Sequence, residues 1–256
     1  VVLSPSIWGS EIAEKYKNSG KLLCDVKTKH KSIFTIGVTG TNGKTTTVSM
    51  IKEILENAGN KVLLGGNGGG GFEGYYDLIL EADEEDYDVL LIEVCDMTLS
   101  FCSYCFDFDL IALTNMGNDH MDVHGSMESY KESLKSFFKD QCIFLNDKQE
   151  YADEFKKVSK ETIEYGESKY DLQLFGKFNK INAGLSEALA KHINENFFSI
   201  EEKTIKNTLE NFQPVKGRLE VLRLNDCNIF IGKTDNSDAL KPILDEVDFN
   251  IFFIGT

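Results

Sequence analysis

The amino-acid sequence predicts an α/β protein in which helices flank a mainly parallel sheet. Short apolar runs rich in β-branched residues alternate with segments whose apolar residues recur at helical spacing. Some runs, such as residues 87–94 (YDVLLIEV), are apolar at nearly every position, as strands buried on both faces of a parallel sheet are. Another run, residues 33–38, leads into a glycine-containing loop and then a helical pattern. This order of strand, loop and helix is typical of a phosphate-binding unit.

Length and charge limit the classes of function. The chain has 256 residues, of which 41% are hydrophobic, enough for a sizeable core in one large domain or two modest ones. Its net charge of −15 argues against a nucleic-acid partner and against an anionic membrane surface, since both need a basic footprint. No apolar run approaches the roughly 18 residues of a membrane span, and no charged-then-apolar leader opens the chain. We therefore expect a cytoplasmic protein.

The loop after residues 33–38 reads TGTNGKTTT (39–47). Its glycines let backbone N–H groups turn inward around phosphate oxygens, and the following helix adds the positive end of its dipole. Lys44 would reach the β- and γ-phosphates, and the Thr45 hydroxyl would bind Mg²⁺. The strict pattern has glycine where Val38 stands, so Gly40 supplies the turn; a plain polar turn is the alternative. The predicted phosphate-binding residues are Gly40, Thr41, Asn42, Gly43, Lys44, Thr45 and Thr46.

The segments on either side of this unit continue the alternation. Residues 1–32 predict a short apolar strand and a short helix ending at Gly20. The helix after the phosphate loop has apolar residues at helical spacing, and Gly59 is placed to end it. Residues 61–74 (KVLLGGNGGGGFEG) predict a strand that runs into a glycine-rich loop around Asn67. That loop is either a flexible connector or a place where backbone approaches a ligand.

Two further strands end in residues suited to metal binding. Residues 87–94 form the first, and Glu93 at its carboxyl end could hold Mg²⁺ directly or through water. Residues 108–114 form the second and lead into NMGNDHMDVHG (115–125), with two histidines and two aspartates within six residues. Doubly wound sheets bind their ligands at the carboxyl ends of their strands. The alternatives are a solvent-facing glutamate and a surface turn rich in Asp, Asn and Gly.

The second half of the chain adds helices and strands of the same kind. Ser126 can cap a helix to about residue 139, on which Lys131 and Lys135 share a face that spacing alone predicts to be solvated. Asn179 and Asn182 lie in the first turn of a later helix, where capping is one role open to them. Further strands are expected at 141–145, 162–165, 219–224, 228–231 and 250–254, and further helices end near 159, 196, 211 and 247.

The six cysteines are expected to be free thiols, because a nucleotide loop suggests a reducing compartment. Cys102 and Cys105 form a CxxC, and Cys95 lies seven residues before it. A zinc or redox site is the alternative, although no second CxxC or nearby histidine pair completes four ligands. A GTPase is another class, since residues 122–125 match DxxG. The guanine-reading Asn-Lys-x-Asp is missing, however, so we do not favour it.

Taken together, the motifs resemble the central ATP-binding domain of the Mur ligase family. These ATP-dependent ligases form amide bonds and include folylpolyglutamate synthases. The order and spacing of the motifs carry the resemblance, above all TNGKTT together with Asn-x-x-x-Asp-His-x-Asp. The matching segments are TGTNGKTTT (39–47), GGN (65–67), IEV (92–94), TNMGNDHMDVHG (114–125), the lysine fifteen residues after His120, GKFNKIN (176–182) and GRLEV (217–221).

The resemblance implies that ATP phosphorylates a substrate carboxylate and that an amino group then attacks the acyl phosphate. In such a site Thr45 and Glu93 would hold one Mg²⁺, and His120 a second. Lys44 and the backbone amides of residues 40–43 would hold the phosphates. Lys135 matches a lysine that is carbamylated in many members and helps to hold the second metal. This reading replaces the solvated surface lysine that spacing alone predicts.

Three more residues receive roles from the resemblance. Asn179 matches the residue that recognises adenine, Arg218 one that contacts the nucleotide phosphates, and Asn67 a loop asparagine near the γ-phosphate and the acceptor. The sequence also departs from the family. Cys95 and Asp96 stand where two serines are common, and the segment between residues 165 and 175 is short, so a β-hairpin region is expected to be missing.

The resemblance also implies a division of the chain into three parts. Residues 1–32 would be a reduced N-terminal segment and residues 33–224 the ATP-binding central domain. Residues 225–256 would be the start of a Rossmann-like C-terminal domain, which we expect to be incomplete. A partner chain or the missing domain would then complete the site.

The predicted function is an ATP-dependent ligase of cell-wall peptide synthesis, of the muramyl or pseudomurein type. Its substrates would be a small-molecule or peptide-precursor carboxylate and an amino acid. The alternatives are a Mur-like ligase of a cofactor pathway, of the coenzyme F430 or folylpolyglutamate type, and a non-catalytic ATP-binding partner.

Overall fold

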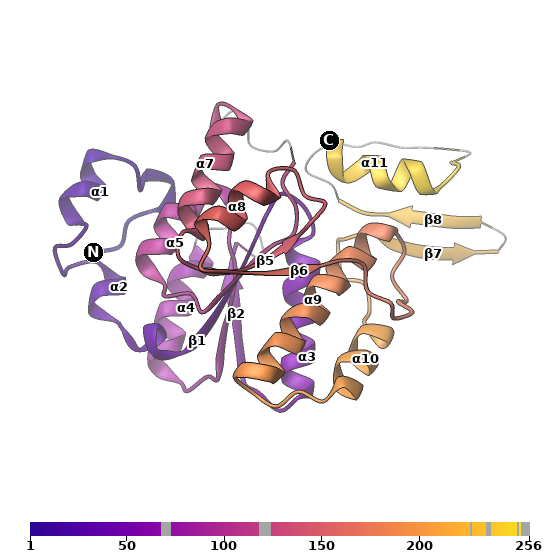
Figure 1. Cartoon of the computed structure of the whole chain (residues 1–256), viewed down its shortest axis with the longest axis horizontal. Coiled ribbons are helices and arrows are strands. Elements are labelled where there is room, and N and C mark those ends of the chain that lie inside the picture. The colour runs from indigo at the N-terminus through magenta and orange to yellow at the C-terminus, as the bar shows by residue number, and fades with distance from the viewer. Residues whose placement is uncertain (68–72, 118–123, 226, 234–236, 250, 252–256) are drawn as a thin grey trace.

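A computed structural model describes residues 1–67, 73–117, 124–225, 227–233, 237–249 and 251. At its centre is a six-stranded sheet in the order β2-β3-β1-β4-β5-β6, in which every neighbouring pair is parallel (Figure 1). The strands are β1 (Phe34–Thr39), β2 (Val62–Gly66), β3 (Val89–Glu93), β4 (Leu110–Leu113), β5 (Cys142–Asn146) and β6 (Glu161–Tyr165). The predicted parallel α/β sheet is therefore confirmed.

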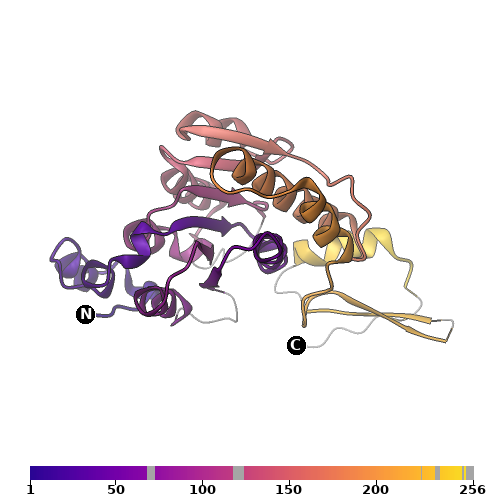
Figure 2. The same cartoon turned by 90° about the horizontal axis from the view of Figure 1, so that it is seen from below.

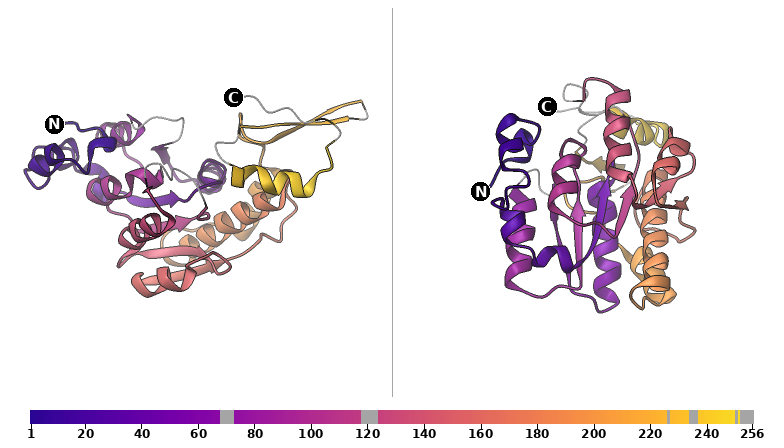
Figure 3. Two further views of the ribbon diagram at one scale, coloured as in Figure 1. Left: turned by 90° about the horizontal axis from the view of Figure 1, so that it is seen from above. Right: turned by 60° about the vertical axis from the view of Figure 1, so that its left-hand side comes forward.

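Helices cover both faces of this sheet (Figure 3). The helices of one face are α3 (Lys44–Asn57), α9 (Lys177–Asn196) and α10 (Glu202–Asn211), and those of the other are α4 (Glu73–Glu84), α5 (Leu99–Cys105), α7 (Met127–Phe138) and α8 (Ala152–Val158). In β3, Leu90 and Ile92 join the apolar core under α4 and α5, whereas Val89 and Leu91 join the core under α3 and α9. Burial on both faces explains why the strand sequences are apolar throughout.

The start of α7 and the end of α3 follow the predicted signals, whereas the helix expected to end at Gly20 ends at Tyr16. The hydroxyl of Ser126 accepts a hydrogen bond from the backbone N–H of Ser129 at 3.1 Å and so caps α7. Beyond the end of α3, Gly59 has a φ of +92°, a left-handed conformation that glycine adopts at little cost. Helices α4 and α5 were not predicted from the sequence.

The first 32 residues form short helices, so the prediction of a short apolar strand in this segment is wrong. They comprise η1 (Pro5–Ile7), α1 (Glu11–Tyr16), α2 (Leu23–Val26) and η2 (Lys29–Ser32). Pro5 opens the first of them, where a missing N–H costs nothing, and the Ser4 hydroxyl caps it. The segment packs on α4 and α5: the Trp8 ring lies 5.1 Å from that of Phe101, and the Tyr76 hydroxyl donates to the carbonyl oxygen of Leu3.

Beyond α10 the chain leaves the central sheet. Strands β7 (Glu220–Leu224) and β8 (Cys227–Ile231) form an antiparallel pair, and α11 (Ser237–Glu246) follows them (Figure 2). The Glu246 carboxylate accepts the backbone N–H of Lys177 at 2.8 and 3.1 Å. A carboxylate is favourable at the N-terminus of a helix, so this contact ties α11 to the first turn of α9. The strand expected at 250–254 falls outside the described residues, apart from residue 251.

Candidate functional site

A cavity of about 660 Å³ lies at the carboxyl ends of the central strands. Its walls include the loop between β1 and α3, the ends of β2, β3, β4 and β5, and the first turn of α9. Parallel α/β sheets bind their ligands at this edge. The predicted site residues in its lining are Thr41, Asn42, Gly43, Lys44, Thr45, Thr46, Asn67, Glu93, Asn179 and Arg218.

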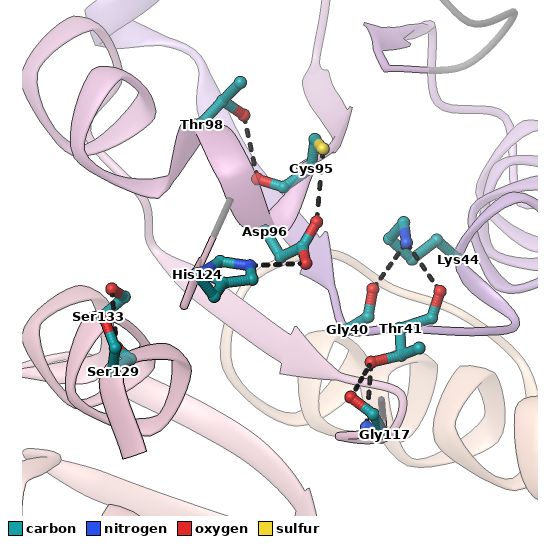
Figure 4. Close-up of polar contacts among 10 residues, drawn as sticks. All are labelled: Gly40, Thr41, Lys44, Cys95, Asp96, Thr98, Gly117, His124, Ser129 and Ser133. Carbon is teal, nitrogen blue, oxygen red and sulfur yellow. Dashed lines mark hydrogen bonds and ion pairs between the residues drawn. The ribbon is translucent and has the colours of Figure 1, made fainter. Parts of the chain in front are cut away.

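The phosphate loop has the backbone that a nest of inward N–H groups requires. Gly40 and Gly43 have φ values of +126° and +86°, and a Cβ atom at Gly40 would lie 2.3 Å from the hydroxyl of Thr114. Neither position therefore accepts a side chain without strain. The Lys44 ammonium donates hydrogen bonds to the carbonyl oxygens of Gly40 at 2.5 Å and Thr41 at 2.9 Å, so it lies over the loop (Figure 4).

The loop is held by the segment that follows β4, which the sequence analysis marked as a ligand-binding turn without assigning a role to Asn115. The Asn115 side chain accepts from the backbone N–H of Asn42 at 3.0 Å and donates to its carbonyl oxygen at 2.8 Å. The Thr41 hydroxyl accepts from the backbone N–H of Gly117 at 2.9 Å (Figure 4). Asn115 stands in the predicted motif 114–125, and its place there was the one signal that could have identified it.

Glu93 carries a buried carboxylate beside the phosphate loop. Its residue is 3% exposed, and its Oε2 atom has no hydrogen-bond partner within the described part of the chain. The backbone of Asn67 donates to the Glu93 carbonyl oxygen at 2.8 Å, which fixes the end of β2 against the end of β3. A buried carboxylate oxygen without a partner is costly unless a cation or donor meets it. Together with the Thr45 hydroxyl in the same wall, it fits a Mg²⁺ ion.

Helix α9 and the turn before β7 close the other side of the cavity. The Asn179 amide donates to the carbonyl oxygen of Phe175 at 2.7 Å and accepts from the amide of Asn182 at 3.3 Å. A Cβ on Gly43 would lie 2.5 Å from the side-chain oxygen of Asn182, so α9 packs tightly on the phosphate loop. Arg218 donates to the Thr45 hydroxyl at 2.7 Å, which brings the two predicted residues into contact across 173 positions of sequence.

The structure does not bring Lys135 to this cavity. Its ammonium lies 2.8 Å from a carboxylate oxygen of Glu132 and 3.6 Å from one of Glu154, and it is absent from the lining residues. The hydrogen bond to Glu132 raises the pKa of Lys135. Lys131, expected on a solvated face, is 6% exposed and is bonded to Glu128 and Glu154. His120 lies outside the described residues.

A second buried polar group lies close to β3. The imidazole of His124 contacts the carboxylate of Asp96 at 2.8 Å, with side-chain exposures of 6% and 1% (Figure 4). The Cys95 thiol donates to the same carboxylate at 3.4 Å, and burial raises the pKa of Cys95 to about 12. The His124 ring stacks on Tyr130 at 4.4 Å. Asp96 and His124 therefore form a buried pair, which the sequence analysis did not predict.

The CxxC does not gather a metal site in the part of the chain that the structure describes, where no three His, Cys, Asp or Glu residues are grouped to hold an ion. All six cysteines are free thiols. Residues 146–149, for which the sequence analysis predicted no binding role, also line the cavity. Among the described residues, no helix is both long and apolar enough to cross a membrane.

Comparison with known proteins identifies the family. The model of the Mur ligase middle domain matches residues 38–209, the greater part of the chain. The chain belongs to the Mur ligase family. A UDP-N-acetylmuramoylalanine--D-glutamate ligase from Wolbachia pipientis wMel is 40% identical over 139 residues, which are 51% of this chain and 25% of that relative. This Mur ligase chain spans about half the length, or less, of the curated relatives that it matches.

Solved structures share the fold of this Mur ligase chain. MurF from Acinetobacter baumannii superposes with a TM-score of 0.73 at 16% identity, covering 88% of this chain and 56% of that one. A pseudomurein peptide ligase type C from Methanothermus fervidus superposes with a TM-score of 0.69 at 19% identity, covering 96% of this chain and 64% of that one. The resemblance stated from the motifs is therefore confirmed at the level of family and fold.

Proposed function

We propose that this Mur ligase chain is the ATP-binding part of a ligase that joins a carboxylate to an amine. The observation that carries the proposal is the buried Glu93 carboxylate, whose unpartnered oxygen shares one cavity with Lys44 and Thr45. An ammonium, a hydroxyl and a carboxylate around a glycine loop are the groups that hold a nucleoside triphosphate with Mg²⁺.

The roles of the residues follow from their positions around the cavity. The backbone amides of residues 40–43 and the Lys44 ammonium would bind the β- and γ-phosphates, since the loop glycines leave no side chain in the way. Thr45 and Glu93 would hold Mg²⁺, which neutralises phosphate charge when it is bound. Arg218 would move from the Thr45 hydroxyl to the phosphates, and Asn179 would read adenine at the first turn of α9.

The chemistry that suits this arrangement is transfer of the γ-phosphoryl group to a carboxylate. The two reactants are both anionic, so a site must screen their repulsion and hold them in line. Lys44 and the loop amides can do so without any proton transfer. The resulting acyl phosphate has a good leaving group, and an incoming amine can displace phosphate from it.

We also propose metal-binding roles for His120 and Lys135, which the family resemblance implies. His120 would hold a second Mg²⁺ as the family resemblance implies. Lys135 would assist it as a carbamate, which requires its amine to become neutral and to leave the carboxylates of Glu132 and Glu154.

The substrates are proposed from the relatives. Curated relatives are named as UDP-N-acetylmuramoylalanine--D-glutamate ligases, and a structural neighbour as a pseudomurein peptide ligase. We therefore propose a peptide-precursor carboxylate and an amino acid of cell-wall synthesis. Because the chain spans about half of its relatives or less, we propose that a further domain or a partner chain completes the amino-acid side of the site.

The test is phosphate release from ATP and from GTP with Mg²⁺, measured against a panel of carboxylate acceptors and amino acids. Turnover that requires ATP, an acid and an amine together would support the proposal and name the substrates. Slow turnover with ATP alone would favour a nucleotide-binding fragment or partner that awaits its missing domain, and a clear preference for GTP would contradict the proposal.

The matched control is Lys44→Ala, which removes the ammonium over the loop. It should abolish nucleotide turnover, while circular dichroism and the melting temperature confirm that the chain is folded. Turnover unchanged from wild type would remove the phosphate-loop assignment.

A further inference from the structure

We propose that Cys24 and Cys105 are a modification site, where a peroxide converts two buried thiols into an intramolecular disulfide. Their Sγ atoms lie 3.0 Å apart although the residues are separated by 81 positions of sequence. Each residue is 1% exposed. Cys24 belongs to α2 of the N-terminal segment and Cys105 to the last turn of α5, so the bond would join two separate parts of the chain.

The two side chains need little movement to form the bond. A disulfide has an S–S distance of about 2.05 Å, so the sulfurs would approach by about 1 Å. The backbone on both sides is already fixed by hydrogen bonds. The imidazole of His30 contacts the carbonyl oxygen of Cys105 at 2.8 Å, and the backbone N–H of Leu22 donates to the Asp25 carboxylate at 3.1 Å beside Cys24.

The structure assigns Cys105 to Cys24 and not to Cys102, its partner in the CxxC. The Sγ of Cys102 lies 3.7 Å from the Thr98 hydroxyl, one turn back along the helix. It is fully buried in the apolar core. Sequence spacing alone would pair the two cysteines of the motif, but in the structure the Cys105 sulfur contacts that of Cys24 and the Cys102 sulfur contacts Thr98.

The thiol pair has the chemistry that disulfide formation requires. The Cys105 thiol donates a hydrogen bond to the sulfur of Cys24. This hydrogen bond lowers the pKa of Cys24 and favours its thiolate, the nucleophilic form. The Cys24 thiolate attacks one peroxide oxygen, the O–O bond breaks, and a sulfenic acid forms as hydroxide leaves and takes up a proton. The Cys105 sulfur then attacks the sulfenic sulfur, its proton leaves with the hydroxyl as water, and both thiols are oxidised by one peroxide.

Access to the buried pair comes through the N-terminal segment. Val26, two residues after Cys24, is 63% exposed, so α2 lies at the surface over the pair. Local opening of such a peripheral segment admits a small oxidant, whereas the core thiol of Cys102 is reached only by wider unfolding. Once formed, the disulfide would hold residues 1–32 against α5.

The experiment uses the whole chain, reduced and then treated with hydrogen peroxide under native conditions. Remaining thiols are alkylated in denaturant, and the peptides are mapped by mass spectrometry. We expect a linked peptide pair containing Cys24 and Cys105, loss of two of the six alkylation sites, and full recovery with a reducing agent. The melting temperature should rise by several degrees on oxidation.

Single variants provide the controls. Cys24→Ser and Cys105→Ser should each lose the linked peptide and the rise in melting temperature, and Cys102→Ser should keep both. A link between Cys102 and Cys105, or alkylation of both Cys24 and Cys105 after treatment that oxidises other cysteines, would overturn the proposal. Because the wild-type map decides the pairing, a serine variant that fails to fold does not weaken the test.

Discussion

Replacing Gly184 by alanine tests how closely helix α9 must approach the loop after β6. Gly184 is buried within α9, and a Cβ atom there would lie 1.8 Å from the carbonyl oxygen of Gly166. It would also lie 2.9 Å from the backbone nitrogen of Ser168. These are backbone atoms that cannot rotate away, so helix and loop would have to separate by about 1.2 Å to reach even a tight contact.

The size of the effect follows from two opposing contributions. Overpacking of this kind costs about 2–3 kcal/mol of folding free energy. Separation also strains two hydrogen bonds of Ser168. Its N–H donates to the carbonyl oxygen of Lys180 at 2.9 Å, and its hydroxyl donates to the Glu187 carboxylate at 2.8 Å. Alanine is better than glycine in a helix by about 0.5–1 kcal/mol. The net loss of about 2 kcal/mol should lower the melting temperature by about 4–8 °C.

The assay is thermal unfolding of Gly184→Ala, followed by circular dichroism, beside Gly166→Ala. Gly166 is the matched control because it lies in the same contact, yet its own Cβ would meet no atom within 4 Å and its φ is not positive. We expect the control to unfold within about 1 °C of wild type. A Gly184→Ala melting temperature equal to wild type, or an equal loss in both variants, would refute the steric reasoning.

Three more substitutions test the site. Glu93→Gln removes the charge of the buried carboxylate, so the Mg²⁺ concentration for half-maximal turnover should rise at least about tenfold, and an unchanged value would exclude Glu93 from metal binding. Lys135→Ala should cripple activity, with partial rescue by short carboxylic acids if a carbamate is needed; full activity would show an ordinary lysine paired with Glu132. Asp96→Ala removes the hydrogen-bond partner of the buried His124 imidazole and should lower the free energy of unfolding by about 2 kcal/mol, measured by denaturant unfolding. A wild-type stability would mean that the pair is unimportant to the fold.

Part of the candidate site was predictable because it is local in sequence. The residues predicted to bind phosphate form one short loop, and the glycines and Lys44 that shape it stand within a few residues of one another. Glu93 was predictable because an acid that ends a buried strand must lie at the carboxyl edge of a parallel sheet. The family motifs added Asn179 and Arg218, which spacing alone did not distinguish from a helix cap and a turn.

Other features needed the three-dimensional structure because they join distant segments. Asn115 holds the phosphate loop from a different strand, and Asp96 finds His124 across 28 positions. Lys135 has the sequence position of a metal-binding lysine, but in the structure its ammonium is bonded to Glu132 and lies outside the cavity lining. A helix fixes the direction of each side chain, and spacing along the chain does not reveal which neighbours that direction meets.

The sequence by itself determined the class of fold and the family of this protein, and it marked the glycine loop that we propose binds phosphate. These features depend on periodicity and on contiguous motifs, which can be recognised in the sequence without knowing how the chain packs. Tertiary structure alone decided which of the cysteines meet, since the Cys105 thiol contacts that of Cys24, 81 positions away in the sequence. It also left one oxygen of Glu93 buried without a partner in the described chain. Burial and side-chain direction arise only when helices and sheet pack together, because packing sets the distances between residues far apart in sequence.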